Sequence, residues 1–339
     1  MDLNTFWFLL VGILLTGYAV LDGFDLGTGP LLLCAKSDHE RRIFLNAIGP
    51  IWNGNEVWLV TGGGALFAAF PQVYATVFSG FYDAFMLLLA ALIFRAVAIE
   101  FRSQRPGTHW RTTWDLAFAI SSGLSALLLG VAFGNIVWGV PLDSAREFQG
   151  NLLTLLHPYA LFTGITALVL FIMHANVYLV LKTEGPLQEK LMSWTRLTVP
   201  AFLACSVTLN AVTLLACPHI VAAFLRRPLI LSPLFLAALL VTFNILREIR
   251  KKRPGRAFAS SCAALVLHML LFGAAVYPNL VFSTPNHAYD LNIYNSASTQ
   301  KTLGFMFVVA IIGVPIVLTY TITVYYIFRG KVELTEESY

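Results

Sequence analysis

The sequence predicts an all-α integral membrane protein with nine transmembrane helices, on the basis of composition, hydropathy and patterning. Of 339 residues, 58% are hydrophobic and only 12% are charged, which is about half of the ~25% typical of soluble domains. Mean hydropathy is +0.73. Because a membrane-spanning helix needs roughly 20 apolar residues, the apolar content fills about nine or ten spans. The apolar runs also lack the alternation of transmembrane β-strands, so a β-barrel is excluded.

Nine apolar segments follow one another along the chain, separated by mostly short polar connections. The first lacks the basic start and the small-residue cleavage site of a signal peptide, so we expect it to be retained as a span. The second is short and begins in polar sequence, and the seventh is interrupted by Pro233. The expected spans cover residues 6–31, 54–70, 81–101, 113–137, 158–181, 191–216, 229–246, 257–277 and 302–328.

Positive charges alternate between successive connections and thereby predict the orientation. The connections after the odd-numbered spans, with the C-terminal tail, hold 17 Lys and Arg residues, the opposite set holds 4, and Arg95 lies within the third span. Because cytoplasmic loops carry the excess of Lys and Arg, we expect the N-terminus outside and the C-terminus in the cytoplasm. Topology therefore explains the net charge of +4, and we expect no nucleic-acid partner.

Ionisable residues inside the spans are the candidate functional groups, since each costs about 2.5 kcal/mol or more to insert. Asp22 and Asp25 are three residues apart and share one face of the first span. At 1.5 Å per residue, Asp22 lies about 24 Å and Arg95 about 21 Å from the outer starts of their spans. The opposite charges therefore occur at similar depth in the cytoplasmic half.

Three further acids, Glu56, Glu100 and Asp115, are expected at the cytoplasmic ends of spans two to four. Two hypotheses account for the whole acidic set. In the first, Asp22 or Asp25 pairs with Arg95 and the network is only structural. In the second, the acids form a proton entry path or a polar cleft completed by a partner, because intramembrane acids are functional by default. Spans five to eight carry acids only in or beside their cytoplasmic connections, so we expect this half of the chain to have a structural role.

Other chemistries lack support in the sequence. The four cysteines are isolated from one another and form no metal or disulfide spacing. His174 and His268 are expected about 10 and 17 Å from the cytoplasmic ends of their spans, a poor match for the two axial ligands of a haem. We therefore expect either a satisfied polar contact or lipid-facing packing for both. The glycines of spans one and two favour close helix packing, and no metal site is predicted.

Several long motifs, in order, resemble subunit II of cytochrome bd-type quinol oxidases. Residues 17–27 read GYAVLDGFDLG and are similar to the signature that ends the first helix of that subunit. Residues 50–59, PIWNGNEVWL, resemble its second signature and are followed by GGALFAAFP at 63–71. Phe94-Arg95 and GVAFGN at 130–135 are further landmarks. The motif positions singled out here, mainly for packing, are Gly23, Gly27, Trp52, Gly54, Asn55, Trp58, Gly63 and Gly64.

The resemblance implies two four-helix bundles and a peripheral helix. Residues 1–138 would form the first bundle, 139–156 an outer loop, 157–278 the second bundle, 279–301 another outer loop, and 302–339 the peripheral helix with a cytoplasmic tail. It also implies a pseudo-symmetric heterodimer with subunit I, which holds two b-type haems and haem d. That complex oxidises quinol and reduces O₂ to water in a prokaryotic cytoplasmic membrane, taking protons from the cytoplasm without pumping.

For this chain the resemblance implies no haem of its own. It implies support of subunit I, a contribution to a proton path, and contacts with membrane lipids. A structural quinone or phospholipid and small single-span accessory subunits are further partners that it allows. The sequence departs from the family at Asn53, where an acid follows the tryptophan in well-studied members. Glu56 or another acid then substitutes, or protons pass mainly through subunit I. The alternatives are an assembly subunit without a proton path and, less favoured, a secondary transporter, which often shows broken helices in both repeats.

Overall fold

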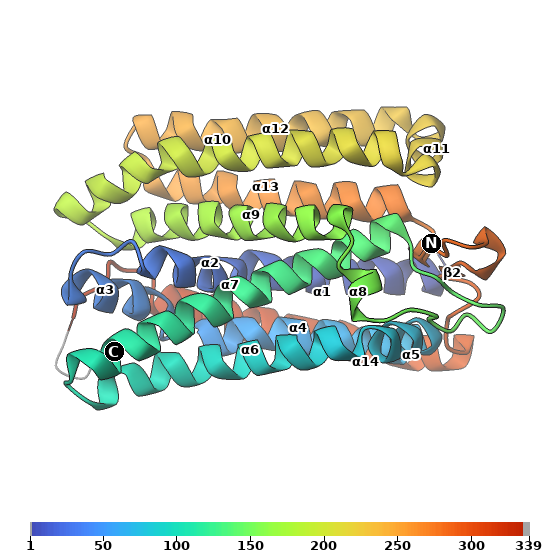
Figure 1. Cartoon of the computed structure of the whole chain (residues 1–339), viewed down its shortest axis with the longest axis horizontal. Coiled ribbons are helices and arrows are strands. Elements are labelled where there is room, and N and C mark those ends of the chain that lie inside the picture. The colour runs from blue at the N-terminus through green and yellow to red at the C-terminus, as the bar shows by residue number, and fades with distance from the viewer. Residues whose placement is uncertain (1, 335–339) are drawn as a thin grey trace.

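The computed structural model describes residues 2–334, and long helices run side by side along one axis of the molecule (Figure 1). The helix at residues 3–21 begins at one end of this axis, and the helix at residues 300–327 ends at the other. Within the described residues, eight helices are long and apolar enough to cross a membrane. The prediction of an all-helical membrane protein is therefore confirmed at this coarser level. Residues 335–339 of the expected cytoplasmic tail lie outside the described residues.

The helices follow the expected spans closely in position. The helices that lie at the expected spans are α1 (Leu3–Leu21) with its continuation α2 (Gly23–Leu32), α4 (Trp52–Ala69), α6 (Tyr82–Phe101), α7 (Thr108–Trp138), α9 (Pro158–Lys182), α10 (Gly185–Ala216), α12 (Pro228–Arg250), α13 (Pro254–Val276) and α14 (Gln300–Ile327). Shorter ones are α3 (Asp38–Ile48), α5 (Pro71–Gly80), α8 (Leu152–Leu155), α11 (Pro218–Arg226), and the 3₁₀ turns η1 (Arg102–Gln104) and η2 (His287–Tyr289).

Local sequence sets the helix starts. Among the described helices, α5, α9, α11, α12 and α13 begin with proline, whose fixed φ and missing N–H suit the first helical position. Asp2, Ser37 and Thr299 cap α1, α3 and α14 by accepting backbone N–H bonds. Several helices extend beyond their apolar stretches, as α10 begins at Gly185 rather than at residue 191. Hydropathy marks the apolar part of a helix, whereas backbone hydrogen bonds continue into polar sequence.

Helix α4 is the expected second span that is not among the eight apolar helices. It has 18 residues and lies along α1, but its first turns contain Asn53, Asn55 and Glu56. These polar residues lower its hydropathy, although it lies lengthwise in the bundle with the other helices (Figure 1). The segment after it, expected as a simple connection, folds as the separate helix α5.

The centre of the molecule is formed by α2, α7 and α9, which pack on one another. Helices α10 and α12 lie along one long edge and α6 along the other (Figure 1). At the end where α1 begins, the two long loops at 139–156 and 279–301 meet, since Val140 N donates to Phe282 O at 2.9 Å. There β1 (Asn279–Val281) pairs antiparallel with β2 (Leu291–Asn292). The opposite end carries α3 and the site described next.

Candidate functional site: buried acids at the α1–α2 junction

The junction between α1 and α2 places two acids inside the bundle. Asp22 separates the helices, yet its N–H still donates to Tyr18 O and its carbonyl still accepts from Leu26 N, so the chain continues almost straight. Gly23 and Gly27 allow α2 to approach α9, because a Cβ at Gly27 would overlap the backbone carbonyl of Phe171. This close packing leaves Asp22 and Asp25 with no exposed surface.

Asp22 is held by an ion pair with Arg95 of α6. The Arg95 Nη1 donates to both carboxylate oxygens of Asp22, at 2.8 and 2.9 Å, and both side chains are fully buried. The Arg95 Nη2 lies 3.5 Å from Glu56 Oε2, whose side chain keeps 23% of its surface exposed. The guanidinium therefore joins one inaccessible acid to one accessible acid. Sequence reasoning left open which aspartate pairs with Arg95, and the structure selects Asp22.

Asp25 is held by a different set of groups. Its Oδ2 accepts a hydrogen bond from Asn55 Nδ2 at 2.7 Å, and Asn55 Oδ1 accepts one from Tyr325 Oη of α14 at 2.8 Å. Its other oxygen, Oδ1, is buried without a hydrogen-bond partner among the described residues. Within that part of the chain, Asp25 also forms no ion pair at 4.0 Å or less. Asp25 is therefore a buried acid with one oxygen held by an amide and the other without a hydrogen-bond partner among the described residues.

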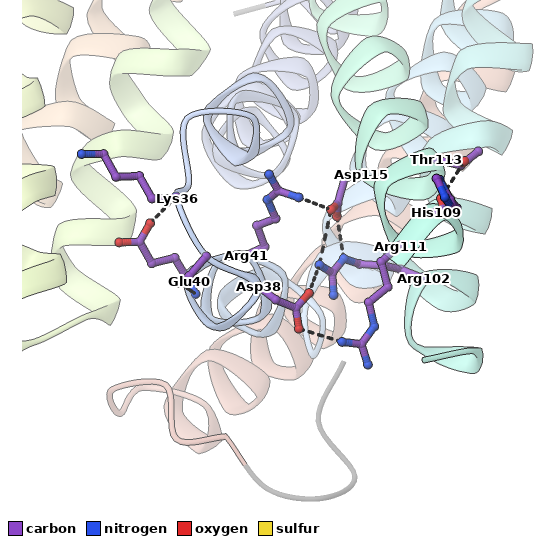
Figure 2. A network of polar contacts seen from close by, with 10 residues as sticks. Lys36, Asp38, Glu40, Arg41, Arg102, His109, Arg111, Thr113 and Asp115 are labelled. Atoms are coloured by element: carbon purple, nitrogen blue, oxygen red, sulfur yellow. Dashed lines mark hydrogen bonds and ion pairs between the residues drawn. The ribbon is translucent and has the colours of Figure 1, made fainter. Parts of the chain in front are cut away.

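A second cluster lies at the same end, around Asp115, as Figure 2 shows. Asp115 accepts from Arg102 Nε at 2.5 Å and from Arg41 Nη1 at 3.0 Å. Asp38 accepts from Arg102 at 2.7 Å and from Arg111 at 2.8 Å. These bonds join α3 to the turn between α6 and α7. Three arginines share two carboxylates, so the cluster fixes helix ends and offers no free acid.

Electrostatics support this structural role for the cluster. Partial burial raises the pKa of Asp38, but the hydrogen bond from Arg102 and the charges of Arg102 and Arg111 outweigh it, so the pKa lies below the usual value. The pKa of Glu40 is lowered in the same way, with burial opposed by hydrogen bonds from Lys190 and from the backbone N–H of Lys36. Both carboxylates therefore stay ionised at neutral pH.

The predicted acids thus divide into two groups and do not form one cluster. Asp22, Asp25 and Glu56 meet around Arg95, while Asp115 belongs to the second cluster. Glu100 is exposed at the end of α6. Asn53 is also exposed, on a different face of α4 from the buried Asn55, so the amide that reaches the buried acids is Asn55. A helix of 3.6 residues per turn places positions 53 and 55 about 200° apart.

The motif residues also divide. Trp52 is buried in the hydrophobic core at this end, Trp58 packs against Gly17 of α1, and Gly54 faces Tyr320 of α14. The expectation that Gly63 and Gly64 permit close packing is wrong for contacts within this chain, because a Cβ at either position meets no heavy atom within 4 Å. The GGG run borders open space except at Gly62, which faces Leu15.

The two intramembrane histidines make internal polar contacts. His174 Nδ1 lies 2.5 Å from Ser261 Oγ and its Nε2 lies 2.9 Å from Val20 O. His268 Nε2 lies 3.0 Å from Ser206 Oγ and its Nδ1 lies 2.7 Å from Ala264 O. With both ring nitrogens engaged, neither side chain fits the role of an axial haem ligand. No cluster of three metal-binding side chains occurs among residues 2–334.

Three contributions to the site were missed by sequence reasoning. Asn55 was singled out only as a motif residue, Tyr325 was not noticed, and Arg102 was only counted as a loop charge. The pairing of Asn55 with Asp25 spans 30 positions and that of Tyr325 with Asn55 spans 270. Only the adjacency of Asn55 and Glu56 in the NGNE stretch at residues 53–56 could have indicated the first of these.

Fold and site together define a polytopic helical membrane protein with a buried ionic network near one end of its bundle. Comparison with known proteins makes this more specific. The family model of cytochrome bd terminal oxidase subunit II matches residues 3–328. Cytochrome bd-I ubiquinol oxidase subunit 2 of Escherichia coli K12 is 35% identical over 361 residues, covering 97% of this chain and 95% of the relative. Cytochrome bd ubiquinol oxidase subunit 2 of Bacillus subtilis is 34% identical over 345 residues, covering 99% and 98%.

The chain belongs to the cytochrome bd terminal oxidase subunit II family. A chain of the bd oxidase of Geobacillus thermodenitrificans has the same fold, with a TM-score of 0.81 at 16% identity over 97% of this chain and 99% of the other. The resemblance expected from the motifs is confirmed. The family's complexes are quinol oxidases that reduce O₂, and this chain is a subunit II of such a complex, with a subunit I as partner.

Proposed function

We propose that this subunit both supports a haem-bearing subunit I and supplies part of the path by which protons enter from the cytoplasm. The observation that carries the proposal is the contrast between two acids on one helix. Asp22 is neutralised by Arg95, whereas Asp25 has an unbonded oxygen and no ion pair among the described residues. Glu56, partly exposed and beside Arg95, is the entry group. It takes the place of the acid that the family carries at the position of Asn53.

The proposed topology has nine spans, with α4 as the second, the N-terminus outside and the C-terminus in the cytoplasm. It is supported by the start of α1 and the end of α14, which lie at opposite ends of the bundle (Figure 1), since an odd number of crossings requires that placement. The Lys and Arg excess supports the same orientation, because the basic residues around α3, η1 and the ends of α9 and α12 then face the cytoplasm. The protein would lie in the cytoplasmic membrane of a prokaryote.

We further propose the domain organisation of two four-helix units, residues 1–138 and 157–278, with a peripheral helix in residues 302–339. The contact between them is tight, because α9 of the second unit packs on α2 and α7 of the first. The peripheral position of α14 is supported by its low burial, as only 6% of its apolar window is buried within this chain.

The cofactor proposal has two parts. The two b-type haems and haem d belong to subunit I, and the engaged nitrogens of His174 and His268 support their absence here. An apolar cavity of about 600 Å³ opens among α1, α7, α9, α10, α12 and α13, lined among others by Phe133, Phe202 and Met269. Its size and apolar lining suit the isoprenoid tail of a quinone or an acyl chain of a phospholipid. Single-span accessory subunits remain a further proposal.

The test replaces Asp25 by Asn in the whole two-subunit oxidase, reconstituted in vesicles. We expect normal assembly and haem content but a strong loss of quinol-driven O₂ uptake and of proton uptake from the cytoplasmic side. The matched control is Asp83→Asn, because Asp83 is an exposed acid at the other end of α6. Wild-type rates and proton uptake in Asp25→Asn and in Glu56→Gln would refute the proton path and leave the assembly role alone.

A further inference from the structure

The peripheral helix α14 is barely embedded in the chain, yet its C-terminal end is fixed by polar contacts. Its only fully buried residue among those described is Leu303, near the other end. The contacts at the C-terminal end reach two places that are far apart in sequence: the end of α9 and the start of α4. Partly buried Val324, Tyr325 and Val332 pack against the core at this end, and specific hydrogen bonds add to that apolar packing.

Two lysines form a reciprocal clasp between the ends of α9 and α14. The Lys182 Nζ donates to Phe328 O and, at 2.9 Å, to Gly330 O. The Lys331 Nζ donates to Leu181 O at 2.7 Å and to Thr183 O at 2.8 Å. Each ammonium thus satisfies carbonyls that the C-terminus of the other helix leaves without an intrahelical partner. The backbone bond from Val332 N to Lys182 O, at 2.9 Å, adds to the clasp.

One turn before the clasp, Tyr325 points its hydroxyl at Asn55. The Tyr325 Oη donates to Asn55 Oδ1, and Asn55 Nδ2 donates to Asp25 Oδ2. Both bonds are polarised toward the carboxyl group, and such chains strengthen one another in a low-dielectric interior. Without the tyrosine hydroxyl, the amide oxygen of Asn55 loses its donor, and the amide loses the contact that fixes which of its ends faces Asp25.

We propose that Tyr325 is a positioning residue for Asp25, acting through Asn55, and that the Lys182–Lys331 clasp holds Tyr325 in place. An amide cannot relay a proton as a carboxyl can, so Asn55 orients the acid and does not conduct. By holding Oδ2 of Asp25, the chain leaves Oδ1 as the oxygen that exchanges the proton. This inference rests on the proposed proton path, and it assigns to the peripheral helix control over the geometry of a buried acid.

The first experiment compares Tyr325→Phe with Tyr326→Phe in the reconstituted two-subunit oxidase. Tyr326 is the matched control because it is adjacent and 63% exposed. Loss of one neutral hydrogen bond predicts about a two- to tenfold fall in turnover and proton uptake for Tyr325→Phe, with unchanged KM for quinol and unchanged haem content. Tyr326→Phe should behave as wild type. Wild-type turnover in Tyr325→Phe would overturn the inference.

The second experiment tests whether Tyr325 acts through Asn55. In a double-mutant cycle, Asn55→Ala combined with Tyr325→Phe should be no slower than Asn55→Ala alone, since interacting residues are non-additive. Additive losses would overturn the inference. If Asn55→Ala does not assemble, Lys182→Met replaces it, with Lys301→Met at the exposed opposite end of α14 as control. Lys182→Met should lower turnover and Lys301→Met should not; equal rates would refute the clasp.

The outcome for Asp25→Asn separates this inference from the function on which it rests. Loss of proton uptake in Asp25→Asn with full activity in Tyr325→Phe refutes the positioning role and keeps the proton path. Full activity in Asp25→Asn refutes both.

Discussion

Removing Arg95 should be among the most damaging single substitutions in this chain. Its guanidinium is fully buried, contacts both oxygens of Asp22 at 2.8 and 2.9 Å, and lies 3.5 Å from Glu56. Arg95→Leu introduces an apolar side chain of moderate size and leaves Asp22 as a buried charge without its counter-charge. We therefore expect loss of assembled complex and a lower unfolding temperature.

The magnitude follows from the geometry. With charge centres about 4 Å apart and an effective dielectric constant of about 20, the pair is worth about 4 kcal/mol of Coulomb energy. This agrees with the roughly 3–5 kcal/mol lost when one partner of a buried pair is removed. Since native proteins are stable by only about 5–15 kcal/mol, such a loss is large enough to reduce assembly in the membrane.

The assay measures the yield of haem-loaded two-subunit complex and its thermal unfolding in detergent. Arg250→Leu is the control, because Arg250 is an exposed arginine at the end of α12. The double variant Asp22→Asn/Arg95→Leu removes both charges and should recover at least half of the lost stability. If Arg95→Leu assembles and unfolds like the wild type, or if the double variant is less stable than either single one, the ion-pair argument fails.

Three further predictions concern packing, pH and assembly. Gly27→Ala should cost about 1–3 kcal/mol of stability from overpacking, because its Cβ would overlap the Phe171 carbonyl. Gly12→Ala is the control and should leave stability unchanged, because a Cβ there meets no heavy atom within 4 Å. Thermal unfolding of the two variants distinguishes these outcomes. Because the pKa of Asp38 is lower in the folded chain than when unfolded, its stabilising contribution is present above about pH 4 and is lost as pH falls through the folded value. Melting temperatures between about pH 5 and 3 should therefore fall less steeply in Asp38→Asn. Gly63→Trp should weaken association with subunit I, because Gly63 borders open space in this chain and a bulky side chain there would project toward a partner. Unchanged recovery of the two-subunit complex in detergent would show that α4 lies away from that contact.

The sequence predicted the positions of the long helices well because apolar runs of about 20 residues leave few alternatives in a membrane. It also indicated that Arg95 pairs with Asp22 or Asp25, since opposite charges buried at similar depth require compensation, and the structure selects Asp22. What it could not supply was rotation about the helix axis. The exposed Asn53 and the buried Asn55 differ by two positions in one motif, and only packing against α1 and α14 decides which of them faces the acids.

The partners of Asp115 could not be predicted for a related reason. The sequence placed this acid at the cytoplasmic end of its span, but its partners Arg41 and Arg102 come from α3 and η1, whose packing leaves no local pattern. Asp115 therefore meets Arg41 and Arg102 at the helix ends and does not join the membrane network. The contact of Tyr325 in α14 with Asn55 could not be predicted from the sequence, because two residues 270 positions apart leave no local pattern.

The two hypotheses for the buried acids are compatible if each applies to a different residue, and we propose this division. In that proposal Asp22 has the structural role, since its charge is balanced by Arg95 and both of its oxygens accept hydrogen bonds. Asp25 lies one helical turn away with one oxygen oriented by an amide and the other unbonded. The ion pair has a further consequence: it fixes α2 against α6 next to Asp25 and leaves the guanidinium shared with the partly exposed Glu56. Substituting Asp22 should therefore damage assembly first, and substituting Asp25 should damage proton uptake first. The order of these two losses distinguishes a scaffold from a proton path more sharply than either variant alone.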